Sequence, residues 1–207
     1  MTGFWIAVSI VAVFGVAWGI AGNWATIKSW SKRSPIIEIV VGDITRERVD
    51  VIVNAAKASL MGGGGVDGAI HRAGGPAILD ECKRLRADAY PDGLPTGEAV
   101  ATTAGRLPAG HVVHTVGPVF RPGFDFSDAD LLRNCYTHSI NVADALGAET
   151  IAFPLISSGV YGWPVGDAVK QALDAISKTR PRNVKKVRLV LFDVATYFTA
   201  AYVANLA

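Results

Sequence analysis

Two patterns of hydrophobic and polar positions alternate along most of this 207-residue chain. Short β-rich runs recur, several of them apolar at consecutive positions, which is typical of strands covered by helices on both faces. Longer stretches between these runs are predicted to be helical. The predicted strands span residues 36–41, 51–54, 99–103, 111–116, 150–153 and 187–192, and the predicted helices span residues 66–73, 76–86, 129–146, 164–179 and 196–206.

The order of these elements predicts the fold class. Strands that alternate with helices favour an α/β domain, a three-layer α/β/α sandwich around one mixed, mostly parallel sheet. Pro76 and Pro164 stand at first helical positions, which tolerate proline. We therefore predict one domain over residues 36–207, preceded by a linker that ends at Pro35.

The first 27 residues follow neither pattern. They contain no Lys, Arg, His, Asp or Glu, and residues 3–21 are almost uninterrupted apolar residues. An apolar helix of about 20 residues crosses a hydrocarbon core of about 30 Å, so we predict one N-terminal transmembrane helix within residues 3–27. A secretory signal peptide would carry basic residues before its apolar core, and a buried core helix is the other alternative.

Lys28, Lys32 and Arg33 follow this apolar segment and indicate its orientation. The positive-inside rule places the C-terminal side of such a span in the cytoplasm. Residues 1–35 are thus expected to be a membrane anchor and linker, in a single-pass membrane protein whose domain faces the cytoplasm. If the segment is not native to the protein, the expected location is cytoplasmic.

The charged residues and the cysteines limit the partners of the domain. The chain has 20 Lys and Arg and 18 Asp and Glu, a formal net charge of +2, and every acidic residue follows Pro35. Without the basic cluster beside the anchor, the domain is close to neutral and gives no support for sequence-specific nucleic-acid binding. Cys82 and Cys135 fit neither a metal-binding nor a disulfide pattern, which indicates a reducing compartment.

Three loops that contain glycine follow predicted strands, at the edge where open α/β sheets bind ligands. In the first loop, Asp43 either caps the next turn or accepts a hydrogen bond from an exocyclic amine. The second loop has four consecutive glycines, residues 62–65, before a predicted helix whose free N–H groups attract anions. Asp67, in the first turn of that helix, either complements the helix dipole or takes part in chemistry.

The third loop, residues 153–164, also opens a helix, so its backbone amides can hold a second phosphate. Two anion-binding loops at one sheet edge suit a diphosphate better than a single phosphate. The pattern is neither a P-loop nor a dinucleotide-binding fingerprint. His71, His111, His114 and His138 are scattered over strands and helices without a nucleophile beside them, so we expect structural or surface roles for them.

Five segments carry a family resemblance: GDIT at 42–45, VIVNAA at 51–56, GGGGVDGAIHR at 62–72, HTVGP at 114–118 and ISSGVYG at 156–162. In this order they resemble macrodomains, and their combination is most similar to bacterial MacroD-type ADP-ribose hydrolases. The resemblance covers about residues 37–202. It implies ADP-ribose or an ADP-ribosylated protein as the partner, with no metal and no cofactor.

The resemblance also implies roles for the loop residues. Asp67 matches the catalytic acidic residue that orients or activates water near the anomeric carbon of the distal ribose, and Asn54 matches the first Asn of the family's Asn-Ala-Ala-Asn motif. Asp43 would bind the adenine amine beside the Ile44 backbone. Phe192 matches an aromatic residue that packs against adenine, with a place in the core at the strand end as the alternative. The residues expected to hold the diphosphate and the distal ribose are Gly63, Gly64, Gly65, Val66, Ser157, Ser158, Gly159, Val160 and Tyr161.

Lys57 replaces the second Asn of that motif and joins Asn54 and Asp67 as a predicted catalytic residue. In hydrolytic relatives this Asn places the ribose against the attacking water. Lysine also donates hydrogen bonds, but it is longer, charged and unable to accept them. It either reaches the ribose hydroxyls or pairs with Asp67, and a pair would lower the basicity of the carboxylate.

Two functions follow from the resemblance. The first is an enzyme that hydrolyses ADP-ribosyl esters, in mono-ADP-ribosylated Asp or Glu side chains or in O-acetyl-ADP-ribose, and Asp67 favours it. The second is a non-catalytic reader of ADP-ribose, and Lys57 favours it. Binding of RNA ends or other nucleotides at the same place is a third alternative.

Overall fold

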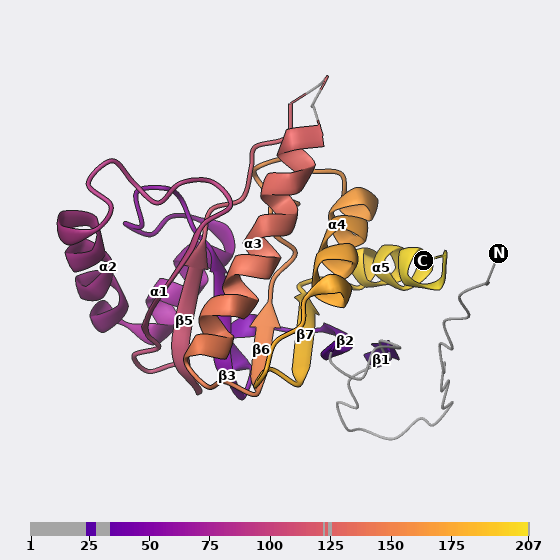
Figure 1. Ribbon diagram of the computed structural model, residues 1–207, viewed down its shortest axis with the longest axis horizontal. Helices are drawn as coiled ribbons and strands as arrows, with labels where there is room; N and C mark the ends of the chain where they lie inside the picture. Colours follow the sequence, from indigo (N-terminus) through magenta and orange to yellow (C-terminus); the bar gives the residue numbers. More distant parts are fainter. Residues whose placement is uncertain (1–23, 28–33, 122, 124–125, 207) are drawn as a thin grey trace.

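A mixed β-sheet forms the centre of the protein (Figure 1). The computed structural model describes residues 24–27, 34–121, 123 and 126–206. The strands within these residues are β1 (Trp24–Ile27), β2 (Ile36–Val41), β3 (Val49–Ala55), β4 (Ala99–Thr103), β5 (Ala109–Thr115), β6 (Thr150–Phe153) and β7 (Lys186–Leu191). They lie in the order β1-β2-β7-β6-β3-β5-β4. The inner five run parallel, and β1 and β4 pair antiparallel at the two edges.

Helices cover both faces of the sheet and make it the middle of three layers (Figure 1). One face carries α1 (Gly65–Gly74), α2 (Pro76–Asp88) and the short 3-10 helix η1 (Ile44–Arg46). The other face carries α3 (Phe126–Ala145), α4 (Val165–Lys178) and α5 (Val194–Leu206). The predicted α/β class with a mixed, mostly parallel sheet is confirmed.

The middle of the sheet is apolar on both faces because successive side chains of a strand point to opposite sides. In β3, Val51 and Val53 belong to the hydrophobic cluster under α3, α4 and α5. Ile52, between them, belongs to the cluster under α1 and α2, and all three side chains are fully buried. A run of consecutive apolar positions is therefore what a strand between two helical layers requires.

The predicted elements of the domain agree with the structure to within three residues at their ends. β2, β4 and β6 have the predicted bounds, and the largest difference is at α3, which begins at residue 126 instead of 129. Periodicity thus located these elements well. It did not predict β1, since residues 24–27 continue an apolar run.

The predicted membrane span of residues 3–27 is corrected by the structure. Its last four residues form β1, whose backbone pairs with β2 from Trp24 opposite Val40 to Ile27 opposite Ile37. Backbone groups paired to a neighbouring strand are not available for a membrane-spanning helix. Among the residues that the structure describes, no helix is both long enough and apolar enough to cross a bilayer. The predicted single-pass membrane localisation is therefore wrong, and residues 3–23 of the predicted span lie outside the described residues.

Candidate functional site

The carboxyl ends of the parallel strands bring the predicted site residues to one edge of the sheet (Figure 1). Asp43 follows β2, Phe192 follows β7, the loop of residues 154–163 follows β6, and Asn54 lies near the end of β3. These strands are neighbours in the order β2-β7-β6-β3, and adjacent strands lie about 4.8 Å apart, so the row from Asp43 to Asn54 is roughly 14 Å long. A row of this length fits an elongated ligand.

A buried hydrogen bond joins β3 to the first turn of α1 at one end of this row. Asn54 Nδ2 donates to Asp67 Oδ1 at 2.8 Å, and the two residues are 0% and 4% exposed. Asp67 lies where the free N–H groups and the dipole of α1 favour a carboxylate. The structure therefore brings together two of the three predicted catalytic residues.

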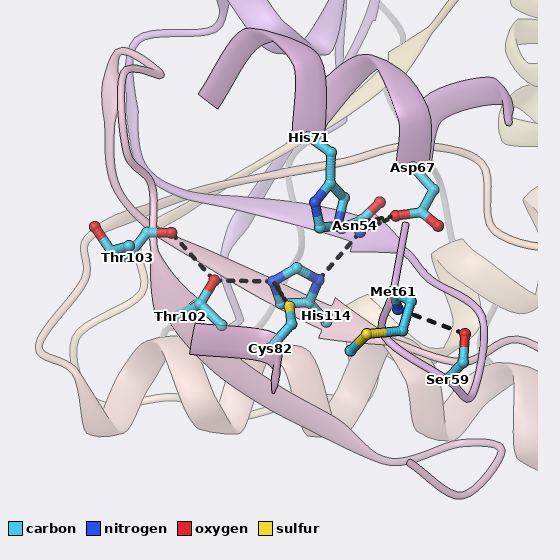
Figure 2. Close-up of polar contacts among 9 residues, drawn as sticks. All are labelled: Asn54, Ser59, Met61, Asp67, His71, Cys82, Thr102, Thr103 and His114. Carbon is cyan, nitrogen blue, oxygen red and sulfur yellow. Dashed lines mark hydrogen bonds and ion pairs between the residues drawn. The ribbon is translucent and has the colours of Figure 1, made fainter. Parts of the chain in front are cut away.

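His114 on β5 continues this network deeper into the protein (Figure 2). It is the register partner of Asn54, and its Nδ1 lies 3.1 Å from Asn54 Nδ2. On the other side of the ring, Nε2 lies 2.9 Å from Thr102 Oγ1, and the Thr102 hydroxyl donates to the Thr103 carbonyl at 3.1 Å. Burial, and then the nearby His71, lower the pKa of His114 to about 3, so the ring is neutral at physiological pH.

His71 lies one turn after Asp67 in α1 and faces the same carboxylate. Its Nε2 is 3.4 Å from Asp67 Oδ1, and its ring centroid is 6.0 Å from that of His114. The two histidines were predicted to have structural or surface roles, and this reasoning missed that they converge beside Asn54. The i, i+4 spacing of Asp67 and His71 was a usable signal, whereas His114 is placed by the register of β3 and β5.

Four buried polar atoms at this edge have no hydrogen-bond partner within the described part of the chain. One is His71 Nε2, and the other three are the oxygens Asn54 Oδ1, Asp67 Oδ2 and Ser157 Oγ. Buried polar groups are almost always hydrogen-bonded, and each unsatisfied group costs about 1–3 kcal/mol. The three oxygens can accept a hydrogen bond, so the arrangement suits a polar ligand that donates from hydroxyl groups or water.

The glycines before α1 allow the loop to approach Asp67 closely. A Cβ atom on Gly63 would lie 3.1 Å from Asp67 Oδ2, and a Cβ atom on Gly68 would lie 2.4 Å from the Gly63 carbonyl oxygen. Gly64 is the N-cap of α1, and Gly65 has a φ of 58°, in the left-handed region that favours glycine. Val66 follows in the first turn. The four predicted residues 63–66 therefore form the entry to α1.

Lys57 approaches the same glycine from the end of β3. Its Nζ lies 3.4 Å from the position that a Cβ atom on Gly63 would occupy, and Asp67 Oδ2 lies 3.1 Å from that position. Lys57 and Asp67 both belong to the described residues, and they form no ion pair there. The lysine side chain is exposed. Lys57 thus stands near the carboxylate without being bound to it.

The loop after β6 is held in a defined shape by its own backbone. Ser157 has a φ of 64°, its carbonyl accepts from Trp163 N at 3.0 Å, and the Tyr161 carbonyl accepts from Phe120 N at 2.8 Å. Gly117 lies so close that a Cβ atom there would be 2.2 Å from Ser157 Oγ.

The other predicted residues of this loop line its surface. Ser158 Oγ donates to the Leu155 carbonyl, and the Gly159 carbonyl accepts from Gly162 N. Val160 is 97% exposed. Gly159 and Val160 are therefore exposed at the tip of the loop, with Ser158 and Tyr161 partly buried on either side.

Asp43 and Phe192 lie at the far end of the row. Asp43 caps η1, accepting from Thr45 N at 2.9 Å and from Thr45 Oγ1 at 2.7 Å. Ile44 beside it is buried, whereas Phe192 is 87% exposed. The alternative of a core position for Phe192 is therefore wrong, and its ring is free to pack against a flat ligand. The cap uses Oδ1 of Asp43. The other oxygen, Oδ2, lies 3.7 Å from Arg46 Nε.

One group of side chains behind Asn54 has the composition of a metal site. Potential ligand atoms of His71, Cys82 and His114 all lie within 4.8 Å of one another. However, both nitrogens of His114 already have hydrogen-bond partners in Asn54 and Thr102. Burial, and then the charges of Asp67 and Glu81, raise the pKa of the Cys82 thiol to about 12. Metal binding would have to deprotonate this thiol and break the network.

Comparisons with known proteins agree on one family. The macro domain family matches residues 53–172. The macro domain-containing protein in sno 5'region of Streptomyces nogalater is 58% identical over 165 residues, 80% of this chain and 90% of that protein. The O-acetyl-ADP-ribose deacetylase of Escherichia coli K12 is 51% identical over 159 residues, 76% of this chain and 88% of that protein. The Oceanobacillus iheyensis macrodomain, solved with ADP, superposes with a TM-score of 0.81 at 38% identity and covers 89% of this chain and 95% of that one.

Proposed function

Because this chain belongs to the macrodomain family, as the sequence resemblance predicted, we propose that it binds ADP-ribose and hydrolyses ADP-ribosyl esters. The substrates would be mono-ADP-ribosylated Asp or Glu side chains or O-acetyl-ADP-ribose. The name of the Escherichia coli relative, O-acetyl-ADP-ribose deacetylase, supports this activity, and the Oceanobacillus iheyensis structure with ADP supports the ligand.

The order of the strands suggests how ADP-ribose lies along the sheet edge. Adenine would pack against Phe192 with its amine toward Asp43, because these residues stand at the β2 and β7 end of the row. The diphosphate would lie between the two loops, residues 63–66 and 157–161, where backbone N–H groups and the start of α1 favour anions. The distal ribose would then reach Asn54 and Asp67.

The observation that carries this proposal is the set of unsatisfied buried acceptors at the ribose end. Asn54 Oδ1 and Asp67 Oδ2 are buried and have no partner within the described residues. They belong to two side chains that the hydrogen bond from Asn54 Nδ2 to Asp67 Oδ1 joins. A ribose offers hydroxyl donors to such atoms, and water offers two. The unsatisfied pair therefore supports both recognition of the sugar and placement of the attacking water.

In the proposed reaction, Asp67 orients and activates a water molecule that cleaves the ester. One C–O bond of the ester breaks, water supplies the hydroxyl group that completes the products, and these products are the free carboxylic acid and ADP-ribose. The other oxygen of Asp67 accepts the hydrogen bond from Asn54 Nδ2 and has His71 Nε2 3.4 Å away. General-base catalysis of this kind contributes about 10²–10⁴-fold to the rate.

We further propose that Lys57 takes the place of the family's second Asn as a donor to the ribose. It lies close to Gly63 and Asp67, is exposed, and forms no ion pair with Asp67, both residues being described by the structure. A lysine that is free of the carboxylate leaves Asp67 able to act as a base. A reader without turnover remains the second candidate, because a charged side chain replaces the neutral amide at this position.

The experiment that separates the two candidates is release of label from an auto-modified mono-ADP-ribosylated protein. The full chain should bind ADP-ribose and release labelled ADP-ribose with multiple turnovers. Tight binding without any release would make the protein a reader.

A further inference from the structure

His114 and Thr102 have no contact with the proposed ribose position, yet they form an ordered chain of hydrogen bonds that ends at Asn54 (Figure 2). All three residues are buried, with exposures of 0% for Asn54 and His114 and 3% for Thr102. The chain crosses three neighbouring strands, since Asn54 lies on β3, His114 on β5 and Thr102 on β4. Rotation of any one of these side chains would break a hydrogen bond of the next.

The direction of each hydrogen bond follows from Asp67. A carboxylate only accepts, so the amide atom of Asn54 that lies 2.8 Å from Asp67 Oδ1 must be the donating Nδ2. The second hydrogen of that NH₂ group faces His114 Nδ1 at 3.1 Å, so Nδ1 must be unprotonated.

The neutral imidazole then carries its proton on Nε2. This N–H donates to Thr102 Oγ1, and the Thr102 hydroxyl donates onward to the Thr103 carbonyl. The hydrogen bonds accordingly all run in one direction, from Asn54 to His114, from His114 to Thr102 and from Thr102 to the Thr103 carbonyl. Burial and the nearby His71 hold the pKa of His114 far below its usual range, which keeps Nδ1 free to accept.

We propose, on the basis of the proposed function, that His114 and Thr102 are positioning residues which fix the Asn54 amide with its oxygen toward the distal ribose. In this orientation both hydrogens of Asn54 Nδ2 are used inside the protein, and Oδ1 is the buried atom without a partner. Asn54 consequently recognises a donor, a ribose hydroxyl. A flipped amide would place its oxygen against Asp67 Oδ1 and against the lone pair of His114 Nδ1, two repulsive contacts.

The first test compares two substitutions of Thr102, a residue two hydrogen bonds away from Asn54. Thr102→Val keeps the shape but removes the oxygen acceptor for His114 Nε2–H and leaves it only the Cys82 sulfur, 3.8 Å away. Thr102→Ser keeps the hydroxyl. Calorimetry of the full chain with ADP-ribose and with ADP measures the effect, because ADP lacks the distal ribose. Thr102→Val should lower the affinity for ADP-ribose by about 5-fold or more and leave that for ADP unchanged, and Thr102→Ser should behave as the parent.

His114→Phe removes both ring nitrogens at similar size and should have the larger effect, a loss of roughly 10- to 100-fold for ADP-ribose alone. The positioning role would be overturned if a variant lost affinity for ADP-ribose and for ADP equally. It would also be overturned if the ratio of the two affinities were unchanged in a folded Thr102→Val protein. If the parent itself does not prefer ADP-ribose to ADP, the proposed function fails instead, so the two failures are distinguishable.

The second test needs neither ligand nor variant. Long-range ¹H–¹⁵N NMR of the parent protein distinguishes the two tautomers of each histidine. His114 should carry its proton on Nε2. It should not titrate between pH 5 and 8, whereas a histidine with the ordinary pKa of about 6.5 would titrate in this range. A proton on Nδ1 would require a flipped Asn54 amide and would refute the proposal even if His114→Phe did not fold.

Discussion

Individual side chains at the ribose end are placed by partners that are distant in the sequence. Asn54 is held by Asp67 in α1 and by His114 in β5, so its amide has one favourable orientation. Asp67 in turn has His71 beside one oxygen and an unsatisfied second oxygen. These contacts satisfy both amide hydrogens of Asn54, and the proposed function assigns the two oxygens that stay unpaired, Asn54 Oδ1 and Asp67 Oδ2, to the ribose and the attacking water.

Two substitutions at Lys57 should show what the lysine does. If it donates to the ribose, Lys57→Asn, which restores the family residue, should change turnover little because it keeps a donor. Lys57→Ala should lower turnover by roughly 10-fold, the cost of about one hydrogen bond. Label release measured alongside ADP-ribose affinity tests this. A large gain of turnover in Lys57→Asn would instead show that the lysine suppresses Asp67.

At the adenine end, Asp43 has a structural role as well as the proposed binding role. Asp43→Ala should weaken ADP-ribose binding by about 1 kcal/mol. This is the lower end of the usual cost of removing a hydrogen-bond partner, because the Asp43 carboxylate is half-exposed. Asp43→Asn is the matched control for the cap, since its Oδ1 can still accept from Thr45 N. Calorimetry on both variants separates the roles. Wild-type affinity in a folded Asp43→Ala protein would mean that Asp43 only caps η1.

Among the larger elements, the two glycine-containing loops are shaped by close approaches of backbone to side chain. Gly63 and Gly68 let the loop before α1 pack against Asp67, and Gly117 lets the end of β5 pack against Ser157. A side chain at Gly63 or Gly68 would displace the loop before α1, and one at Gly117 would displace the loop after β6.

Gly117→Ala tests this packing. Its Cβ would lie 2.2 Å from Ser157 Oγ and 2.7 Å from Ile156 Cγ2, so the loop must move. We expect the free energy of unfolding to fall by about 1–3 kcal/mol and ADP-ribose binding to weaken. Gly42→Ala is the control, because a Cβ there makes only ordinary contacts at 3.9 Å. Urea denaturation measures the difference, and equal stability of the two variants would contradict the packing argument.

The elements themselves could largely be predicted from the sequence because the strands and helices of the domain have clear periodicity. The apolar run of β3 and the prolines at the helix starts are local signals. β1 could not be predicted in this way, since Trp24–Ile27 belong to an apolar run that has the composition of a membrane helix. Its identity as an edge strand depends on pairing with β2, a contact that composition does not reveal.

The candidate site was predictable only as far as its loops. Asn54 and Asp67 stand in recognisable motifs, and the structure places them in contact. The convergence of His71 and His114 beside Asn54 was not predicted, because it depends on a helix turn and on strand register, which bring together residues up to 60 positions apart. The exposure of Phe192 likewise follows from the end of β7 and not from its hydrophobicity.

For the molecule as a whole, the length of the sheet edge is expected to select the length of the ligand. The row from Asp43 to Asn54 spans three strand spacings, roughly 14 Å. The full chain should therefore bind ADP-ribose much more tightly than AMP, which lacks the second phosphate and the distal ribose. Calorimetry with both ligands measures the difference, and equal affinities would exclude the arrangement of two anion-binding loops.

The most direct test of the account is ester hydrolysis by the parent and by Asp67→Asn. The substitution keeps the shape of the side chain and an oxygen that can accept from Asn54 Nδ2, but it removes the basic carboxylate. With O-acetyl-ADP-ribose or a mono-ADP-ribosylated protein as substrate, turnover should fall by about 10²–10⁴-fold while ADP-ribose affinity changes only a few-fold. Unchanged turnover in Asp67→Asn, or a parent protein that binds tightly and releases no product, would contradict it.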